Sequence, residues 1–327
     1  VYDIAIIGGG IAGVAAAVQT ARMGMKTVLI EKTALVGGLA TGGLINVFLP
    51  LCDGNGHQVT FGIAEEMLRK SIVYGPGEIP PGWRNECNGE ERKRFISVFS
   101  PASFALALDE MLDGAGVDVW LDSLVCNVRV GNGMVTRLEV ENESGRIELS
   151  AKRFIDASGS AVLARRLGQN VVTDDNCFSC WALEFSHDSL HMNYGPVYGN
   201  GAPTGVFSDD DLAAAGTSLE KLKQETRHGI SGKQVSEYFR VTRRYLRSYY
   251  AHAYESGKNG RKSFYPVKLP IMPQFRKICA VRARTMMTGG DGKHVEDSIG
   301  MVADWRRAGL IWEVPYSALV PQEGPDN

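Results

Sequence analysis

Residues 1–31 read VYDIAIIGGGIAGVAAAVQTARMGMKTVLIE, and this stretch decides the fold. The apolar run Tyr2–Ile7 is typical of a strand buried in a parallel sheet. Three glycines follow, and then an Ala- and Val-rich stretch predicts a helix over residues 11–23, with Gly24 where helices commonly end. Residues 27–31 predict a second buried strand. Together these segments predict a complete strand–helix–strand unit.

The turn between the first strand and the helix has glycines at Gly8, Gly10 and Gly13, which is the spacing GxGxxG. The first glycine permits a tight turn, the second lets the backbone approach a pyrophosphate, and the third lets helix and strand pack closely. The N-terminus of the helix offers unpaired N–H groups to phosphate oxygens. Glu31 ends the second strand, where its carboxylate can accept hydrogen bonds from both hydroxyls of an adenosine ribose. The combination predicts a dinucleotide site.

A second glycine-rich stretch, GGLATGG at residues 37–43, follows soon after Glu31. NAD does not need such a loop, whereas the ribityl chain and ring of FAD need backbone that passes close beside them. Three strands are expected over residues 117–130, 134–141 and 146–151, joined by glycine-containing turns. A further buried strand is expected over residues 154–157, and the small residues Ser158 and Gly159 follow it. These features favour FAD as the cofactor.

The stretches DIAIIGGGIAGVAAA, EKTALVGGLATGG and AKRFIDASGSAVLARRLG resemble a known family, the FAD-dependent oxidoreductases of the glutathione-reductase-like two-dinucleotide-binding group. Three later stretches, LPIMPQFRK, EDSIGMVADWRRAG and VPYSALVPQ, also look like this family. Within the group, the sequence is most similar to bacterial FAD-dependent oxidoreductases, which are distantly similar to the flavin subunits of heterodisulfide reductases and succinate dehydrogenases. The resemblance implies an α/β fold, with a Rossmann-like FAD-binding parallel sheet, a β-meander crossover and an inserted substrate lobe.

The resemblance also implies which residues bind FAD. The first glycine turn would hold the pyrophosphate and Glu31 the ribose, the second glycine loop would line the ribityl and flavin region, and Val125 would meet the adenine through its backbone. The implied cofactor-binding residues are Ile7, Gly8, Gly9, Gly10, Ile11, Ala12, Gly13, Glu31, Lys32, Gly37, Gly38, Leu39, Ala40, Thr41, Val125, Ala157, Ser158 and Gly159. Family members continue with a strand, a glycine-rich turn and a helix that complete the flavin site, and we expect a chain ending at Asn327 to lack them.

The domain organisation is inferred from the point at which regularly patterned segments give way to irregular sequence. Residues 1–168 are expected to form the FAD-binding domain, with an excursion over 50–99. An irregular stretch and then a long amphipathic helix indicate an inserted substrate lobe over residues 169–275, and residues 276–327 would return towards the FAD-binding domain. Five tyrosines of that helix, between Tyr238 and Tyr254, are interpreted as packing residues.

The expected function is an FAD-dependent oxidoreductase that transfers a hydride between the flavin and a small organic substrate. The sequence has no second GxGxxG followed by a helix, so a built-in NAD(P)H domain is not expected. Two alternatives stay open: a flavin-binding electron-transfer subunit without a small-molecule substrate of its own, and an NAD-linked dehydrogenase. The first would need a protein partner that exchanges electrons with the flavin, and association into a homo-oligomer is also left open.

Polar residues that could take part in catalysis are few, and the catalytic residues stay unassigned. His57 could lie near the flavin, although a solvated turn is the more ordinary interpretation of the sequence DGNGH. Arg276 could direct a cation at an anionic substrate or at reduced flavin, or could pair at the surface. His294 lies in one of the family-like stretches.

Composition excludes several classes of protein. The formal net charge is −2 and no basic stripe stands out, so nucleic acid is not an expected partner. No segment is long and apolar enough to span a membrane, and no signal peptide is recognised. Six scattered cysteines are better interpreted as free thiols in a reducing compartment than as a disulfide scaffold, so a cytoplasmic protein is expected. The six cysteines lack the spacing of an iron–sulfur or other metal site, and Cys177 and Cys180 are interpreted as inert buried thiols rather than a redox pair.

Overall fold

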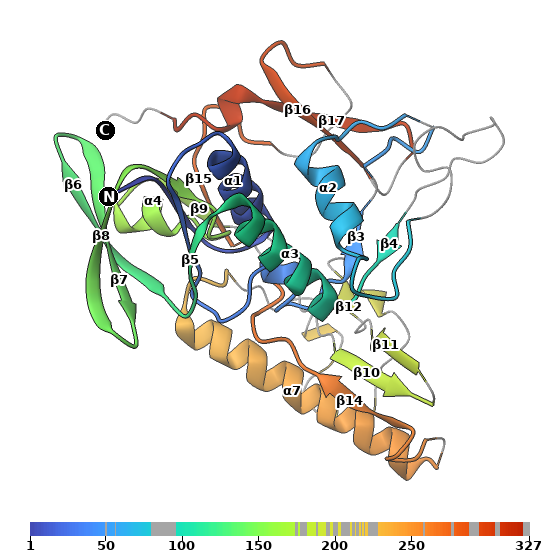
Figure 1. Cartoon of the computed structure of the whole chain (residues 1–327). Helices are drawn as coiled ribbons and strands as arrows, with labels where there is room; N and C mark the ends of the chain where they lie inside the picture. The colour runs from blue at the N-terminus through green and yellow to red at the C-terminus, as the bar shows by residue number, and fades with distance from the viewer. Residues whose placement is uncertain are drawn as a thin grey trace. The chain divides into compact units, whose positions relative to one another are not determined.

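The computed structural model describes residues 1–49, 51–55, 57–79, 96–173, 176, 182–187, 189–193, 197–198, 202–203, 210, 213, 216, 218, 220–221, 228–257, 259–275, 278–287, 294–304 and 308–322. Its backbone contacts divide the chain into two compact units (Figure 1). The first unit comprises residues 1–41, 45–171 and 281–327, and the second comprises residues 42–44 and 172–280. Each unit is described separately below.

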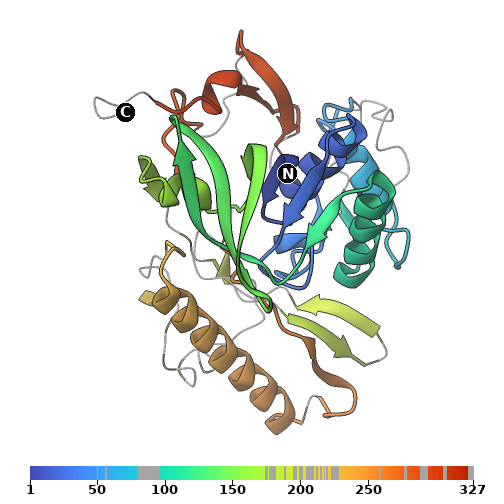
Figure 2. The same ribbon diagram turned by 60° about the vertical axis from the view of Figure 1, so that its left-hand side comes forward.

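A six-stranded sheet with the strand order β5-β2-β1-β8-β7-β6 organises the first unit. Its strands are β1 (Tyr2–Ile7), β2 (Thr27–Ile30), β5 (Asp118–Trp120), β6 (Leu124–Gly131), β7 (Met134–Asn142) and β8 (Gly145–Asp156). The pairs β5–β2, β2–β1 and β1–β8 are parallel, whereas β8–β7 and β7–β6 are antiparallel. The three antiparallel strands form the twisted green ribbon of Figure 2. The sequence prediction of a Rossmann-like parallel sheet with a meander is therefore confirmed.

The central strands are buried on both faces. On one face, Ile6 and Leu29 pack against α1 (Ile11–Arg22) and α3 (Pro101–Ala115), which lie side by side in Figure 1. On the other face, Ala5, Ile7, Val28 and Ile30 pack with apolar side chains of the meander, which are Val125, Leu138, Val140 and Leu149. A strand covered on both faces has no polar face, which explains why YDIAII and TVLI contain continuous apolar runs.

Local signals predicted α3 well. Ser100 is its N-cap and accepts a hydrogen bond from the Ser103 N–H, and Pro101 occupies the first turn. The helix ends at Gly116, whose φ of 72° is left-handed. A helix bounded in this way needs little help from tertiary contacts to define its ends.

Two strand boundaries differ from the sequence prediction. The single strand expected over residues 117–130 is interrupted at Asp122, whose φ is 47°, because β5 pairs in parallel with β2 while β6 turns away into the meander. Conversely, the two strands expected over 146–151 and 154–157 are one strand, β8. Its first half pairs with β7 and its second half with β1, so the change of partner needs no break in the strand.

Smaller elements complete the described part of the first unit. Met67 and Leu68 of the helix α2 are buried, with Met67 in the same core as α1 and α3. The elements are η1 (Gly38–Ala40), β3 (Val47–Phe48), α2 (Ile63–Lys70), β4 (Ser97–Val98), α4 (Val162–Arg166), β16 (Ser298–Ala303), β17 (Ile311–Pro315) and η2 (Tyr316–Ala318). The strands β9 (Val171–Thr173) and β15 (Cys279–Val281) fall at the boundaries of the two units.

The second unit is built on one long helix, α7 (Gly232–Glu255), which Ser231 caps by accepting a hydrogen bond from the Gln234 N–H. Tyr238, Tyr245 and Tyr250 of this helix are buried with Phe264 and Phe275, which confirms that its tyrosines serve packing. The strands of this unit are β10 (Ala182–Ser186), β11 (Ser189–Asn193), β12 (Val197–Tyr198), β13 (Ala202–Pro203) and β14 (Phe264–Lys268). Across the described residues, no helix has the length and apolarity needed to cross a membrane.

The contact between α1 and β1 can be tested by adding one methyl group. A Cβ atom at Gly13 would lie 1.8 Å from the backbone oxygen of Gly8, so we expect Gly13→Ala to lower the free energy of unfolding by about 3 kcal/mol. The control is Gly10→Ser, because a Cβ at Gly10 meets no atom within 4 Å and serine is a favourable N-cap. Urea denaturation without added nucleotide measures both variants, and equal losses would contradict the packing argument.

Candidate dinucleotide-binding site

The first glycine turn brings three backbone segments into contact. Gly8 has a φ of +102°, and a Cβ there would lie 2.7 Å from the backbone oxygen of Ala157, which follows β8. Gly13 lies against Gly8, so α1 is held close to the end of β1. Only glycine fits at either position, which gives a steric reason for the first and third glycines of the motif.

The N-terminus of α1 is open on the side where the second motif glycine lies. Gly10 is the N-cap, and within the described residues no side chain caps this helix. Space of at least 4 Å surrounds the position that a Cβ of Gly10 would occupy. Backbone N–H groups at an uncapped helix N-terminus, with open space beside them, provide hydrogen-bond donors and a positive dipole end for a phosphate group.

Glu31 follows β2, and its carboxylate is tied to both neighbouring loops. One carboxylate oxygen accepts a hydrogen bond from the Gly9 N–H at 2.7 Å, and the other accepts from the N–H and the hydroxyl of Thr33, each at 2.8 Å. The residue is buried, with 7% of its surface exposed. A carboxylate has about four acceptor positions, and these three donors occupy three of them. The fourth can accept a hydrogen bond from one ribose hydroxyl. A second ribose hydroxyl would have to share an acceptor position with a donor of the protein.

A pocket of about 50 Å³ opens beside this carboxylate, entirely within the first unit. Six of the residues that the resemblance assigned to FAD line it: Ile7, Gly8, Glu31, Lys32, Val125 and Ser158. Five further lining residues were not predicted: Ile30, Ser123, Leu124, Ser160 and Val162. Their only signal in the sequence is that each adjoins or lies close to a predicted residue.

The second glycine loop lies directly on the first. The Gly37 N–H donates to the Gly9 oxygen at 2.7 Å, and Gly10 and Gly37 form a parallel bridge. Gly37 has a φ of +97°, and a Cβ there would lie 2.4 Å from the side chain of Thr41. Thr41 is fully buried, and its hydroxyl donates to the Val36 oxygen at 2.5 Å. The structure thus places Gly37–Thr41 beside the turn predicted to hold the pyrophosphate.

A side-chain network that sequence reasoning missed shapes the turn after β8. One carboxylate oxygen of Asp156 accepts hydrogen bonds from the N–H and the hydroxyl of Ser158, at 3.0 and 2.5 Å, and the other accepts from the Leu163 N–H at 2.8 Å. The Asp156 carboxylate therefore fixes both the turn at residues 157–159 and the start of α4. The signal was available as an Asp and a Ser two residues apart at a strand end.

The three catalytic candidates do not lie in this pocket or cannot be placed. The His57 ring is 77% exposed and pairs with Asp53, with 3.0 Å between its Nδ1 and a carboxylate oxygen. The His294 ring is 79% exposed and pairs with Glu313. Arg276 lies outside the described residues. Their assignment to catalysis stays a prediction, and none is among the residues that line the pocket.

The described residues contain neither a disulfide nor a metal centre. Cys52, Cys126 and Cys279 form no disulfide, and Cys177 and Cys180 lie outside the described residues. In the part of the chain that the structure describes, no group of three or more His, Cys, Asp or Glu side chains is placed to hold a metal ion.

The residues present fit the adenosine and pyrophosphate part of FAD. The pocket offers a buried acid, an apolar wall and backbone from the segment that includes Val125. Gly10, the N-cap of the open helix, comes two residues after Gly8 of the pocket lining. A parallel sheet with such a site at the carboxyl ends of its strands defines a dinucleotide-binding protein. The sequence profile of the family described as FAD dependent oxidoreductase matches residues 3–177, more than half of the chain. The chain belongs to this family and its cofactor is FAD, as the sequence predicted.

Two curated relatives illustrate the similarity. Digeranylgeranylglycerophospholipid reductase of Thermoplasma volcanium is 32% identical over 161 residues, which are 48% of this chain and 39% of that protein. The enzyme of the same name from Picrophilus torridus is 27% identical over 220 residues, 63% of this chain and 52% of that protein. The chain thus spans about half, or less, of the length of these relatives.

Among solved structures, a geranylgeranyl bacteriochlorophyll reductase-like protein from Thermoplasma acidophilum is similar to this chain. It shares 21% sequence identity, with a TM-score of 0.45, and the alignment covers 82% of this chain and 64% of that one.

We expect Glu31→Gln to weaken FAD binding by about 10- to 100-fold, because hydrogen bonds to a charged group contribute about 1.5–3 kcal/mol. Quenching of flavin fluorescence on titration with the protein measures the dissociation constant. The control is Glu141→Gln, since Glu141 is a half-exposed residue of β7 that pairs with Arg146 at 2.8 Å and lies outside the pocket. If both variants bind FAD as tightly as the wild type, Glu31 does not hold the ribose.

The Asp53 turn provides a test of pH dependence. Burial alone would raise the pKa of Asp53, but the N–H groups of Asn55 and His57 and the imidazole ring together hold this pKa below its ordinary value of 3.8. The ionised carboxylate therefore stabilises the fold at neutral pH, and that contribution is lost as the pH falls through the lowered folded pKa.

We expect Asp53→Asn to lower the free energy of unfolding at pH 7 by about 1–2 kcal/mol. Urea denaturation at neutral and at acid pH should show this difference shrinking as the pH drops below 3.8. Glu143→Gln, at an exposed turn, serves as the control and should leave the stability unchanged at both pH values. A difference between Asp53→Asn and wild type that does not change with pH would contradict the role of the ionised group.

Proposed function

We propose that the protein is an oxidoreductase that transfers a hydride between FAD and a small organic substrate. The observation that carries the proposal is the buried Glu31 carboxylate, which is bonded to the Gly9 N–H of the GxGxxG turn and lines the pocket beside it. A buried acid held against a glycine turn at a helix N-terminus is the arrangement that recognises the adenosine end of a dinucleotide.

Bound FAD supplies the redox chemistry, because its ring system accepts or donates a hydride. The residues of this chain hold and orient the cofactor. In this proposal the N-terminus of α1 and Gly10 bind the pyrophosphate, Glu31 accepts from the ribose, and the backbone of Val125 meets the adenine. Gly37–Thr41 line the ribityl and ring portion, because this loop packs on the first glycine turn.

One alternative uses the same site: the protein binds FAD but passes electrons to a protein partner and has no small-molecule substrate. An NAD-linked dehydrogenase, the other alternative left open by the sequence, does not agree with the FAD-dependent family to which the chain belongs. The lipid substrate in the names of the two relatives is not included in the proposal, because the matches span only 39% and 52% of those proteins.

A visible absorption spectrum of the purified protein, followed by anaerobic screening, tests the proposal. We expect flavin bands after purification or after addition of FAD, and we expect at least one small organic compound to bleach or restore them without a partner protein. Bound FAD that responds only when a redox protein is added would favour the electron-transfer alternative. FAD bands that no small organic compound and no redox protein changes would overturn the proposal.

A further inference from the structure

The region around α7 carries an excess of positive charge that the net charge of the chain conceals. Residues 221–280 contain 14 Lys and Arg against 3 Glu, although the whole chain has a formal net charge of −2. The basic side chains of α7 itself are Lys233, Arg240, Arg243, Arg244 and Arg247. A charge spread so unevenly over a chain indicates an anionic partner, because nothing in the packing of the helix requires it.

Four of these basic residues share one exposed face of α7. Arg240, Arg243 and Arg247 are separated by three and four residues, and Lys233 lies two turns before Arg240, so all four project from the same side of the helix. Each of the four is exposed. At about 1.5 Å per residue, the face extends over roughly 21 Å. Because its members are not adjacent in the sequence, the stripe becomes visible only once the helix is formed.

The cations of this face are not neutralised by the protein itself. Across the part of the chain that the structure describes, no carboxylate forms an ion pair with Lys233, Arg240, Arg243 or Arg247. Glu237 is the only acidic residue of α7 between the two ends of the face. Cations without paired carboxylates keep a positive potential that attracts an anionic surface.

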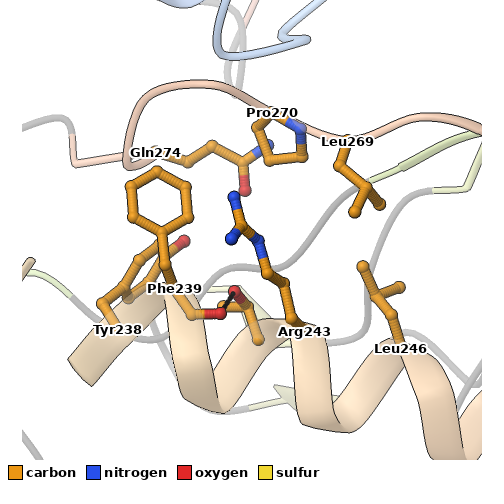
Figure 3. Close-up of a pocket in the computed structure, with 8 residues that line it drawn as sticks. Tyr238, Phe239, Arg243, Leu246, Leu269, Pro270 and Gln274 are labelled. Atoms are coloured by element: carbon orange, nitrogen blue, oxygen red, sulfur yellow. Dashed lines mark hydrogen bonds between the residues drawn. The ribbon is translucent and has the colours of Figure 1, made fainter. Parts of the chain in front are cut away.

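The face offers no recess for a small ligand. The pocket beside α7, which lies between the helix and residues 269–274, has a volume of about 10 Å³, the space of about one water molecule. Arg243 extends from α7 towards Pro270 and Gln274, with its guanidinium 5.2 Å from the centre of the Phe239 ring (Figure 3). The Gln274 amide in the pocket wall donates to the Gly43 oxygen at 2.7 Å. A protein partner needs pockets that its central side chains can fill, and this one is too small for a side chain.

Two further observations favour a lipid bilayer over nucleic acid. The rings of Tyr238, Tyr245 and Tyr250 are buried in the core of the second unit, so they offer no surface on which bases could stack. Ile271 directly follows Pro270 of the pocket lining, and 51% of its surface is exposed. An exposed apolar side chain close to unpaired cations is typical of proteins that lie at a bilayer interface.

We propose that this face of α7 binds the surface of a bilayer that contains anionic lipids. The four cations attract the lipid phosphates, and Ile271 enters the boundary between headgroups and acyl chains. Each basic side chain near such a surface strengthens binding by about fivefold, and the attraction weakens as salt screens it. This binding goes beyond the proposed redox function and does not depend on it.

Co-sedimentation of the whole chain with lipid vesicles tests the proposal. We expect binding to vesicles made of equal parts phosphatidylcholine and phosphatidylglycerol, little binding to phosphatidylcholine alone, and release at high salt. This comparison needs only the wild-type protein, so it decides the question even if a variant does not fold. Equal binding to both kinds of vesicle, or to neither, would overturn the proposal.

A triple variant tests whether α7 is the face that binds. Replacement of Arg240, Arg243 and Arg247 together by Gln should weaken binding to the anionic vesicles by about 100-fold, because three attractions are lost. Far-UV circular dichroism checks that the helix is retained.

The matched control replaces Arg69, Arg137 and Arg146 together by Gln. It removes the same net charge from exposed arginines of the first unit, each of which pairs with a glutamate at 2.8–2.9 Å. Its binding should stay within about twofold of wild type, since these charges are already neutralised locally. Equal losses in the two triple variants would mean that net charge alone attracts the protein, and would overturn the assignment to α7.

Two last measurements test the place of Ile271 and the class of partner. Ile271→Gln should weaken vesicle binding by about fivefold, and unchanged binding would contradict its place at the interface. Polyglutamate is the probe for an acidic protein. If the wild type binds polyglutamate but not the anionic vesicles, and the α7 triple variant loses that binding, the face belongs to a protein partner and the proposal is wrong.

Discussion

The first unit depends on one close approach, between the start of α1 and the ends of two strands. Gly13 lies against the Gly8 oxygen, and Gly8 lies against the backbone of residues 157–158, with no room for a side chain at either contact. This contact fixes the direction in which α1 leaves β1, and therefore where its N-terminus points. Because β1 lies between β2 and β8 in a parallel arrangement, the loops after all three strands meet at one edge of the sheet.

Side-chain hydrogen bonds then hold these loops in place. Glu31 joins the loop after β2 to the Gly9 N–H. Asp156 shapes the turn after β8 and accepts a hydrogen bond from the Leu163 N–H in the first turn of α4. Each carboxylate is engaged by donors of the protein itself, so the edge that receives the cofactor is organised in advance. Preorganisation of this kind lowers the entropy that a ligand loses on binding, because the loops do not have to be ordered at that moment.

The sequence predicted those parts of the fold that depend on local patterns. The strand–helix–strand unit, the capped helix after Ser100 and the meander all follow from periodicity and turn residues within short windows. Glu31 was found because its distance from the glycine motif is set by the length of one helix and one strand. The continuity of β8 was missed, since nothing within residues 145–156 shows that the strand changes partner from β7 to β1. Such a change is a property of the sheet and not of the strand.

The cofactor site and the pocket beside α7 differ in how much of each the sequence reveals. The first is built mainly from backbone, so it imposes glycine at fixed spacings and leaves a readable pattern. The second is built from side chains of segments far apart in the chain: Gln274 reaches an oxygen 231 positions away. The acceptor of this bond is a backbone carbonyl, which every residue type at position 43 offers. The bond therefore leaves no recognisable residue type at position 43. A pocket of this construction can change through single side chains while the glycine motif stays intact, which is why membership of the family indicates the cofactor and does not indicate the substrate.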